Sequence, residues 1–405
     1  MRRILVLGGG TAGTLAANLM ARELGKEIKK GEVEITLLDA DGKHLFQPNF
    51  LYIAFKGMSP KKLERKENNL LHKRINFHVD PAAIIDFKKK TVTTTNNNIY
   101  QYDDLVIASG AAIARGEIPG FDEANLDFHS TQENAWAIWE RINGIKSGKI
   151  VVGISTLPHK CPPSPVEAAF LVEQFLKKKK LKDKVEVHFV TPLPRPYPDA
   201  TISKTVEKRF KERGITIHPF FNIDRVDPKK KILYSMEGGE LDFEAMFVVP
   251  PHKAPQAIID SNIGDEEGWI PVDKHTMLVK DQQGVYALGD VADLPTSKSG
   301  VTAHLEAVVV AKNIIADVKK TGELCHFTGR THCPMDVGYG KGLFVITAYG
   351  RNAKDVQPSR FNMMMKKGFG MMYWRTVKGS MEWLMDMFFG EDARDCFHEE
   401  PIETT

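Results

Sequence analysis

The chain has 405 residues, of which 42% are hydrophobic and 26% are charged, and its formal net charge is +3. This length allows two domains, and the composition is typical of a globular protein. The lysines are scattered or lie in short runs, so we expect no nucleic-acid partner. Uncharged stretches of about 18 residues, the length that spans a bilayer, are absent from the sequence. We expect no signal peptide, because Met1-Arg2-Arg3 leads directly into a predicted strand.

Four cysteines, Cys161, Cys325, Cys333 and Cys396, are too few and too widely spaced for a disulfide framework. They predict inert core thiols, or one redox pair that folding brings together. We expect Cys325 and Cys396 to be inert, because a lone cysteine usually behaves as a small hydrophobic residue. No metal site is expected.

A glycine-rich loop lies near the start of the chain. Residues 4–7 predict a short buried strand, residues 8–13 read Gly-Gly-Gly-Thr-Ala-Gly, and residues 14–24 favour a helix. In a dinucleotide-binding loop, the first glycine permits a tight turn, the second lets the backbone approach the pyrophosphate, and the third packs helix against strand. A second predicted strand, residues 33–38, ends in Asp39, which is placed to bind the adenosine ribose. We therefore predict a bound dinucleotide.

The next segments connect this domain to a second one. Residues 41–57 are aromatic and irregular, and Pro48 is expected to break any helix, so they predict a surface loop. Residues 76–86 and 91–95, on either side of a basic turn, predict a β-meander. A further buried strand, residues 102–110, closes on small residues before the crossover.

A second domain is predicted from alternating strands and helices, which favour a parallel sheet. The predicted strands are residues 149–154, 185–191, 215–219 and 245–249, and the predicted helices are residues 165–178 and 201–213. After the first of these strands, where a Rossmann domain normally has its glycine loop, residues 160–167 read Lys-Cys-Pro-Pro-Ser-Pro-Val-Glu. A helix N-terminus lowers the pKa of a cysteine, so Cys161 is predicted to be a functional thiol.

The last third of the chain returns to the first domain and then changes in composition. A predicted strand ends in Gly289-Asp290, and a loop over 295–300 leads to a helix over 302–319. A strand is predicted over 343–348. Residues 361–390 are rich in methionine and aromatic residues.

One apolar face is predicted within that final segment. Val377, Met381, Leu384 and Phe388 recur at helical spacing. A helix of this kind either docks on its own domain or lies in the headgroup region of a bilayer.

These features together resemble the two-dinucleotide-domain flavoproteins of the disulfide reductase type, and within them the sulfide:quinone oxidoreductases. The resemblance covers nearly the whole chain. The matching residues are Cys161 with Glu167 after it, Val-Pro-Pro-His at 249–252, Gly-Trp-Ile-Pro-Val-Asp at 268–273, Cys333 after the long helix, and Trp-Arg-Thr-Val-Lys-Gly-Ser-Met-Glu-Trp at 374–383. The last of these is similar to the membrane-anchoring end of that family. Members often carry histidines beside the site, to which only His129 corresponds, and loosely.

The resemblance implies an α/β fold with two Rossmann-like dinucleotide-binding domains and a C-terminal amphipathic helical tail. The implied segments are residues 1–115 for the first part of the FAD-binding domain, 116–250 for a second Rossmann-like domain with Cys161 in place of an NAD loop, 251–330 for the return segment of the FAD domain, and 331–405 for the region that contacts quinone and membrane.

FAD is the cofactor that the resemblance implies. Many members carry a further cysteine in the linker, sometimes bonded to the flavin, whereas residues 116–148 hold none, so we expect noncovalent binding. The implied FAD-binding residues are Gly8, Gly10, Thr11, Ala12, Gly13, Asp39, Ala82, Ser109, Gly110, Gly289, Asp290 and Gly300.

The family pattern further implies that Cys161 and Cys333 flank the flavin as a redox pair. HS⁻ opens their disulfide and leaves a persulfide on one cysteine. The freed thiolate, for which Cys333 is favoured, then attacks the flavin and hands over the electron pair. The reduced flavin passes the electrons to a quinone on its opposite face, and repeated additions give polysulfide or zero-valent sulfur.

Other site residues are implied around this pair. Glu167 shuttles protons or merely caps its helix, and Lys298 faces the N1–O2 edge of the flavin. Phe46 resembles a quinone-stacking position, and Tyr373 and Trp374 are expected to complete that pocket.

The implied partners are sulfide, a membrane quinone and a membrane surface. We expect residues 361–390 to contact the membrane, a peripheral location on its cytoplasmic face, and a homo-oligomer. Deletion of residues 361–405 is then expected to release the protein from membranes and to slow quinone reduction, while the flavin stays reducible by sulfide.

Three alternative functions remain. A type II NADH:quinone oxidoreductase shares fold, FAD and quinone but needs a second glycine fingerprint, which residues 152–158 do not provide. A flavocytochrome c-type sulfide dehydrogenase passes electrons to a haem subunit and is exported. A non-catalytic flavin-binding scaffold would fit better if one of the two central cysteines were missing, and both are present.

Overall fold

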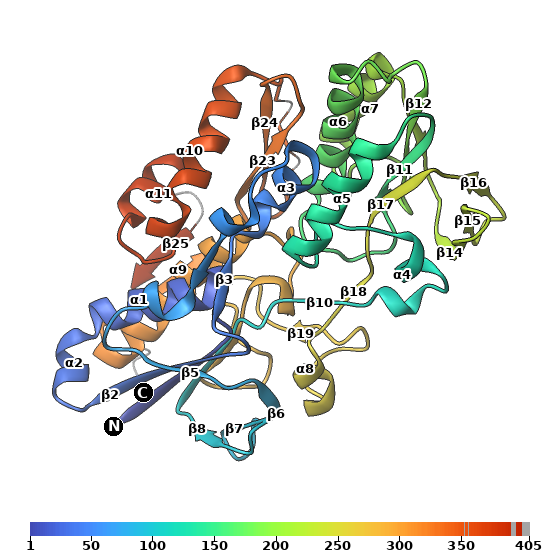
Figure 1. Cartoon of the computed structure of the whole chain (residues 1–405). Coiled ribbons are helices and arrows are strands. Elements are labelled where there is room, and N and C mark those ends of the chain that lie inside the picture. Colours follow the sequence, from blue (N-terminus) through green and yellow to red (C-terminus); the bar gives the residue numbers. More distant parts are fainter. Residues whose placement is uncertain (352, 355, 390–393, 399–405) are drawn as a thin grey trace.

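Two parallel sheets organise the molecule (Figure 1). The structure is a computed structural model that describes residues 1–405 except 352, 355, 390–393 and 399–405. Each sheet packs helices on one face and a small antiparallel meander on the other. This is the α/β architecture that the alternating strands and helices predict.

The first sheet has five strands in the order β20-β9-β1-β2-β5, all paired in parallel. Its strands are β1 (Arg2–Leu7), β2 (Val33–Asp39), β5 (Asn76–Val79), β9 (Asp104–Ile107) and β20 (Val285–Ala287). Its two faces are covered by α1 (Thr11–Glu23) and α9 (Gly300–Lys319), and by the meander of β6 (Ala82–Asp86), β7 (Thr91–Thr94) and β8 (Ile99–Gln101).

The alternation of side chains along β1 explains this arrangement. Ile4 and Val6 pack on α1 and α9, whereas Leu5 and Leu7 pack on the meander side. Both faces are apolar, as is usual for a buried parallel sheet. Residues 76–79 were predicted to belong to the meander, but they pair with β2 instead, and the meander begins at Ala82.

The second sheet has the strand order β13-β12-β11-β17, again all parallel. Its strands are β11 (Gly148–Ile154), β12 (Val185–Val190), β13 (Ile215–His218) and β17 (Ala245–Val249). The covering elements are α5 (Gln132–Gly144), α6 (Pro163–Lys178) and α7 (Ala200–Arg213), and the meander of β14 (Ile223–Asp227), β15 (Ile232–Ser235) and β16 (Glu240–Asp242). Val152 faces the helices and Val151 faces the meander.

Short elements lie in the connections between these units. The two crossings between the sheets pair with each other as β10 (Ala112–Ile113) and β18 (His252–Lys253). The remaining short elements are α2 (Gly25–Lys29), β3 (Lys43–Leu45), η1 (Gln47–Asn49), α3 (Phe50–Lys56), η2 (Pro60–Leu63), β4 (Glu64–Lys66), η3 (Glu67–Asn69), η4 (Arg115–Glu117), α4 (Phe121–Ala124), α8 (Gln256–Ser261), β19 (Ile270–Pro271), η5 (Gly289–Val291) and β21 (Ala292–Asp293).

The prediction of a surface loop over residues 41–57 is wrong for residues 50–56, which form helix α3. Pro48 lies in the first turn of η1, which leads into helix α3, and residues Phe50 to Phe55 of α3 are buried in the core of the second sheet. A proline just before a helix is tolerated because the first helical turn has no internal partner for its amides. Pro48 therefore starts this helix instead of preventing it.

The C-terminal segment returns to both units. Its elements are β22 (Glu323–Phe327), β23 (Thr331–Asp336), β24 (Gly342–Thr347), α10 (Arg360–Thr376), α11 (Glu382–Phe389) and β25 (Arg394–His398). Strands β23 and β24 form an antiparallel pair whose buried residues join the core of the second sheet. Among the described residues, no helix is long and apolar enough to cross a membrane.

The single apolar helix face predicted for the tail is interrupted. Helix α10 ends at Thr376, and Gly379 has a φ of +65° before α11 begins at Glu382. Val377 is fully buried, so it packs against the protein. Met381 and Leu384 are only half-buried. The side chain of Phe388 lies outside the described residues.

The prediction that Cys325 and Cys396 are inert thiols is also wrong. Strands β22 and β25 pair in antiparallel register, with Cys325 opposite Cys396. The two cysteines form a disulfide that joins positions 71 residues apart. Spacing along the chain did not reveal this pair, because only strand pairing brings the two residues together.

Candidate active site

The glycine loop predicted at residues 8–13 connects β1 to α1 in the way a dinucleotide requires. Gly8 has a φ of +103°, and a Cβ there would lie 2.4 Å from the carbonyl oxygen of Ala108. A Cβ on Gly13 would lie 2.0 Å from the carbonyl oxygen of Gly8. Gly10 caps α1 without any side-chain hydrogen bond, and a Cβ there would meet nothing within 4 Å. The first amides of α1 thus face open space that suits a phosphate group.

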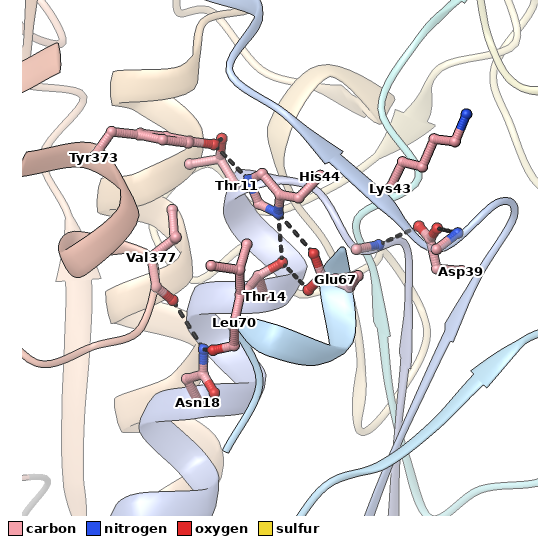
Figure 2. A network of polar contacts seen from close by, with 12 residues as sticks. Thr11, Thr14, Asn18, Asp39, Lys43, His44, Glu67, Leu70, Tyr373 and Val377 are labelled. Atoms are coloured by element: carbon pink, nitrogen blue, oxygen red, sulfur yellow. Dashed lines mark hydrogen bonds and ion pairs between the residues drawn. The ribbon is translucent and has the colours of Figure 1, made fainter. Parts of the chain in front are cut away.

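Asp39 lies beside this loop at the end of β2. Its carboxylate accepts hydrogen bonds from the amides of Gly9 and Gly42, both at 2.7 Å (Figure 2). The acid is therefore held at the edge of the glycine loop. Its contact with the adenosine ribose stays a prediction.

Helix α9 brings a second N-terminus to the same place. A Cβ on Gly300 would lie 3.9 Å from Thr11 Oγ1, and one on Gly289 would lie 3.9 Å from the Cβ of Ala12. The Gly289-Asp290 turn thus sits between the starts of α1 and α9. Two helix N-termini and an apolar, glycine-lined surface fit a flavin dinucleotide.

Glu306 completes this turn and was missed by the sequence analysis. It is buried on α9 and accepts a hydrogen bond from the Gly289 amide at 2.7 Å. Burial raises the pKa of the Glu306 carboxyl to about 8, and burial also raises the pKa of Asp290. A single carboxylate inside the apolar run 303–311 was the signal that could have identified it.

The other predicted cofactor residues lie at the edges of this region. Ser109 is exposed and Gly110 has a φ of +70°, directly after β9. Ala82 begins β6 and pairs with Thr94 in the meander. Their contacts with FAD stay predictions.

Cys161 lies immediately before α6. It has a φ of +89°, and its carbonyl oxygen accepts hydrogen bonds from the amide and the hydroxyl of Ser164, both at 2.8 Å. The expected lowering of its pKa is wrong. Burial raises the pKa of the Cys161 thiol, Glu167 and Cys333 also raise it, and Lys366 opposes them, so that the pKa is about 12. Burial of the thiol therefore outweighs the helix N-terminus.

Cys333 is buried in the middle of β23, next to the loop that precedes α9. Its Sγ lies 3.5 Å from Ser297 Oγ and 3.4 Å from Ser299 Oγ. Tyr197 is also buried, and burial raises the pKa of its phenol. Cys333 and Cys161 lie near enough to raise this pKa as well. The fold thus gathers Cys161, Cys333 and Tyr197 in one place. Both cysteines are free thiols in the structure, and their pairing stays a prediction.

Glu167 does not cap its own helix, so that alternative is wrong. Its buried carboxylate accepts a 2.5 Å hydrogen bond from the Asp336 amide and forms an ion pair with Lys366 of α10. Burial raises the pKa of Glu167, while Lys366 opposes that shift. Lys366 escaped the sequence analysis because lysines are common on helix surfaces. The role of Glu167 as a proton shuttle stays a prediction.

Lys298 is engaged with the Gly-Asp turn and with an aromatic ring. Its ammonium donates 2.8 Å hydrogen bonds to the carbonyl oxygens of Asp290 and Ala292. It also lies 4.0 Å from the centre of the Trp269 ring. Its position beside Asp290 agrees with a place near the flavin, and its contact with the N1–O2 edge stays a prediction.

Three buried histidines surround the Cys161 loop. The sequence analysis noted His129 and, within the Val-Pro-Pro-His motif, His252, but it missed His159. The rings of His129 and His252 lie 5.5 Å apart, and His159 lies within 6.4 Å of both. His129 Nε2 is 2.6 Å from Ser164 Oγ. Burial lowers the pKa of His159 to about 4 and that of His252 to about 3.

A cavity of about 400 Å³ opens beside the two cysteines. Its walls include Pro162, which follows Cys161, and Ser297, which touches Cys333. Other lining residues are Leu157, Pro158, His159, Trp269, Leu294 and Lys298. The cavity therefore lies next to the residues that adjoin the two cysteines, although neither cysteine is part of its wall.

The three aromatic residues predicted for quinone lie together. The ring of Phe46 is 4.3 Å from that of Tyr373 and 6.4 Å from that of Trp374. Phe46 is buried, and Tyr373 and Trp374 are half-buried on α10. The hydroxyl of Tyr373 contacts Thr11 Oγ1 at 2.8 Å and His44 Nε2 at 2.6 Å. Quinone binding at this cluster stays a prediction.

Comparisons with known proteins show what the whole chain is similar to. The sulfide:quinone oxidoreductase of Mus musculus mitochondria is 23% identical over 391 residues, which cover 92% of this chain and 86% of that protein. The crystal structure of the sulfide:quinone oxidoreductase of Aquifex aeolicus has a TM-score of 0.86 at 20% identity and covers 98% of both chains. NDH2 of Plasmodium falciparum in complex with NADH has a TM-score of 0.69 at 13% identity, over 96% of this chain and 97% of that one.

These likenesses confirm the predicted resemblance to sulfide:quinone oxidoreductases and the predicted α/β fold of the disulfide reductase flavoproteins. Residues 2–313 match the family model described as pyridine nucleotide-disulphide oxidoreductase. The chain belongs to the pyridine nucleotide-disulphide oxidoreductase family.

Proposed function

We propose that this chain is a sulfide:quinone oxidoreductase, which oxidises sulfide to polysulfide or zero-valent sulfur and reduces a membrane quinone. The observation that carries the proposal is the convergence of two free thiols from distant segments beside the start of α9. Cys161 comes from the second sheet and Cys333 from the C-terminal segment. The relatives that carry this name cover more than nine-tenths of the chain.

FAD is the cofactor proposed for the joint N-termini of α1 and α9. When bound, it supplies a two-electron acceptor close to the thiols. The proposed contacts are the amides of residues 10–13, Asp39 and Asp290. Noncovalent binding is proposed because residues 116–148 hold no cysteine.

The two cysteines carry the sulfur chemistry in this proposal. In their oxidised, disulfide form, HS⁻ attacks one sulfur, a new S–S bond forms, and the other cysteine leaves as a thiolate. Burial raises the pKa of Cys161 to about 12, so a thiolate there is disfavoured. The persulfide is therefore assigned to Cys161 and the leaving thiolate to Cys333. Loss of two electrons and one proton from the persulfide and the thiolate would give a Cys161–S–S–S–Cys333 trisulfide, with bound FAD supplying the electron acceptor. A second HS⁻ attacks the central sulfur and frees the Cys333 thiolate, which then displaces HSS⁻ from the Cys161 sulfur and restores the disulfide.

Charged residues near the thiols are assigned supporting roles. Glu167 accepts the proton that HS⁻ releases, and its contact with Lys366 keeps the carboxylate available. Lys298 holds the Gly-Asp turn in place through two carbonyl oxygens and adds positive charge beside Asp290.

Quinone is assigned to the aromatic cluster of Phe46, Tyr373 and Trp374. Flat aromatic rings at 4.3 to 6.4 Å from one another provide a stacking surface for a quinone ring. The cluster is built from the start of the chain and from α10, so the C-terminal segment contributes directly to it.

Peripheral membrane contact is proposed through a different face from the one predicted. The exposed apolar side chains of this segment are Phe361, Met364, Met371, Trp383 and Met387. They lie on α10 and α11, and large exposed apolar side chains close together mark an interaction surface. A cytoplasmic location and a homo-oligomer remain part of the proposal.

Anaerobic stopped-flow absorbance at the flavin band tests the function. Sulfide should bleach the flavin rapidly, and NADH should not. Cys161→Ser and Cys333→Ser should each slow this bleaching by roughly a hundredfold or more, since each removes one sulfur of the exchange. Cys325→Ser is the matched control, because Cys325 is bonded to Cys396 and is not part of the proposed Cys161–Cys333 redox pair. Bleaching by NADH with indifference to sulfide would establish the NADH:quinone alternative.

A further inference from the structure

The end of α10 and the two residues after it contact α1 at its start, its middle and its end. Tyr373 touches Thr11 at the start of α1, and Asn18 in its middle donates a 2.9 Å hydrogen bond to the carbonyl oxygen of Val377. Arg22 near its end donates to the carbonyl oxygen of Lys378. The segment predicted to contact quinone and membrane is therefore also a neighbour of the dinucleotide-binding helix.

A chain of buried polar groups runs between the two helices (Figure 2). Glu67 Oε2 lies 2.8 Å from His44 Nδ1, and His44 Nε2 lies 2.6 Å from the hydroxyl of Tyr373. Glu67 and His44 are almost completely buried, and Thr14 on α1 donates a 2.6 Å hydrogen bond to Glu67 Oε1. Burying a carboxylate and an imidazole is costly unless both are fully hydrogen-bonded, so this chain fixes the position of Tyr373 closely.

The chain of polar groups ends at Thr11, next to the dinucleotide loop. Burial raises the pKa of the Tyr373 hydroxyl, so the phenol stays neutral and has one proton to donate. When both ring nitrogens of His44 carry a proton, Nδ1 donates to the Glu67 carboxylate and Nε2 donates to the Tyr373 oxygen. The Tyr373 proton is then directed to Thr11 Oγ1. The proton of Thr11 is then free for an acceptor outside the chain. Thr11 is the first residue of α1 and lies beside Gly300 at the start of α9.

We propose that Tyr373 is a positioning residue for the dinucleotide, which orients the Thr11 hydroxyl toward a phosphate oxygen at the joint N-termini of α1 and α9. The tail helix thereby contributes to cofactor retention from outside the two Rossmann units. Binding free energies are reciprocal, so a bound dinucleotide stabilises the docking of α10 on α1 by the same factor. The inference rests on the proposed function only in requiring a flavin dinucleotide.

Release of flavin from the holoenzyme tests the proposal. The rate is followed by the rise in free-flavin fluorescence after dilution, without sulfide or quinone. Tyr373→Phe keeps the ring and removes the hydroxyl, and it should speed release roughly two- to tenfold, the range for one lost hydrogen bond. Tyr349→Phe is the matched control, because it removes a hydroxyl that bonds to the Lys274 carbonyl oxygen instead. An unchanged rate in Tyr373→Phe, or an equal increase in both variants, would overturn the proposal.

A double-mutant cycle separates positioning from general packing. If Tyr373 acts through the Thr11 hydroxyl, Tyr373→Phe should have little further effect on flavin release in a Thr11→Val background. Additive effects of the two substitutions would mean that the tyrosine only holds α10 in place, and the proposal would be rejected. A protein that releases flavin in this way but is not bleached by sulfide would refute the proposed function and leave this inference standing.

Discussion

At the scale of single residues, burial controls the chemistry of the site more than local sequence does. The start of a helix should lower the pKa of Cys161, yet that pKa is raised to about 12 because the thiol is buried near Glu167 and Cys333. The sequence identified the thiol from its place in a nucleotide slot. Its proton affinity depends on neighbours that folding supplies.

Glu306 provides a test of the same principle through pH. Its pKa is raised from 4.5 to about 8, so the protonated carboxyl stabilises the fold fully below about pH 4.5, and this contribution is lost as the pH rises through 8. Glu306→Gln keeps an acceptor for the Gly289 amide but does not titrate. Between about pH 6 and pH 8 the unsubstituted protein should lose about 2 kcal/mol of unfolding free energy relative to this variant.

Denaturant unfolding of both proteins at the two pH values measures this difference. Asp281→Asn, on an exposed turn, is a matched control for the removal of one carboxylate. If the unsubstituted protein and Glu306→Gln lost stability in parallel, the carboxyl would already be ionised at neutral pH.

At the scale of elements, the C-terminal helices differ from the single helix face that residue spacing predicted. Spacing predicted one apolar face, but the chain turns at Gly379, so Val377 belongs to the protein interior and α11 starts anew. Periodicity is a local property of the sequence, whereas contacts with α1, which is distant in the chain, accompany the burial of Val377. Deleting residues 361–405 would also remove the Tyr373 and Lys366 contacts. That deletion therefore perturbs the fold as well as the membrane surface.

Point substitutions on the exposed face give a cleaner membrane test. Met371 and Trp383 are 79% and 66% exposed, so replacing both with Asp should leave the fold intact. Co-sedimentation with phospholipid vesicles should fall roughly tenfold or more, because two apolar side chains no longer enter the lipid. Met236→Asp, at a residue 71% exposed in another part of the molecule, is the control. Equal sedimentation of all three proteins would refute this membrane surface.

At the scale of the whole molecule, the site is assembled from parts that are far apart in the chain. The second sheet contributes Cys161, the C-terminal segment contributes Cys333, and the first unit contributes the loop before α9 that touches Cys333. The same C-terminal segment returns to the first unit through β22 and β25. The C-terminal segment therefore packs against both the first and the second unit.

The Cys325–Cys396 disulfide joins strands β22 and β25 of the C-terminal segment. Removing it by Cys396→Ala should lower the free energy of unfolding by about 2–4 kcal/mol, because the open chain gains freedom when unfolded. Thiol labelling of the denatured protein provides the direct check. Two cysteines should react without reductant and all four after reduction. Four reactive thiols without reductant would contradict the bond.

The amino-acid sequence by itself determined the parallel sheets, the glycine loop, the Gly-Asp turn and the place of Cys161 before a helix of the second sheet. These features depend on short-range patterns: apolar runs make buried strands, and the nearby carbonyl oxygen of Gly8 excludes a Cβ at Gly13. Tertiary structure alone decided the raised pKa of Cys161, the Cys325–Cys396 bond, and the contact of Tyr373 with Thr11. Each of these joins segments far apart in the chain, and spacing along a sequence holds no information about the distance between such segments until the chain is packed.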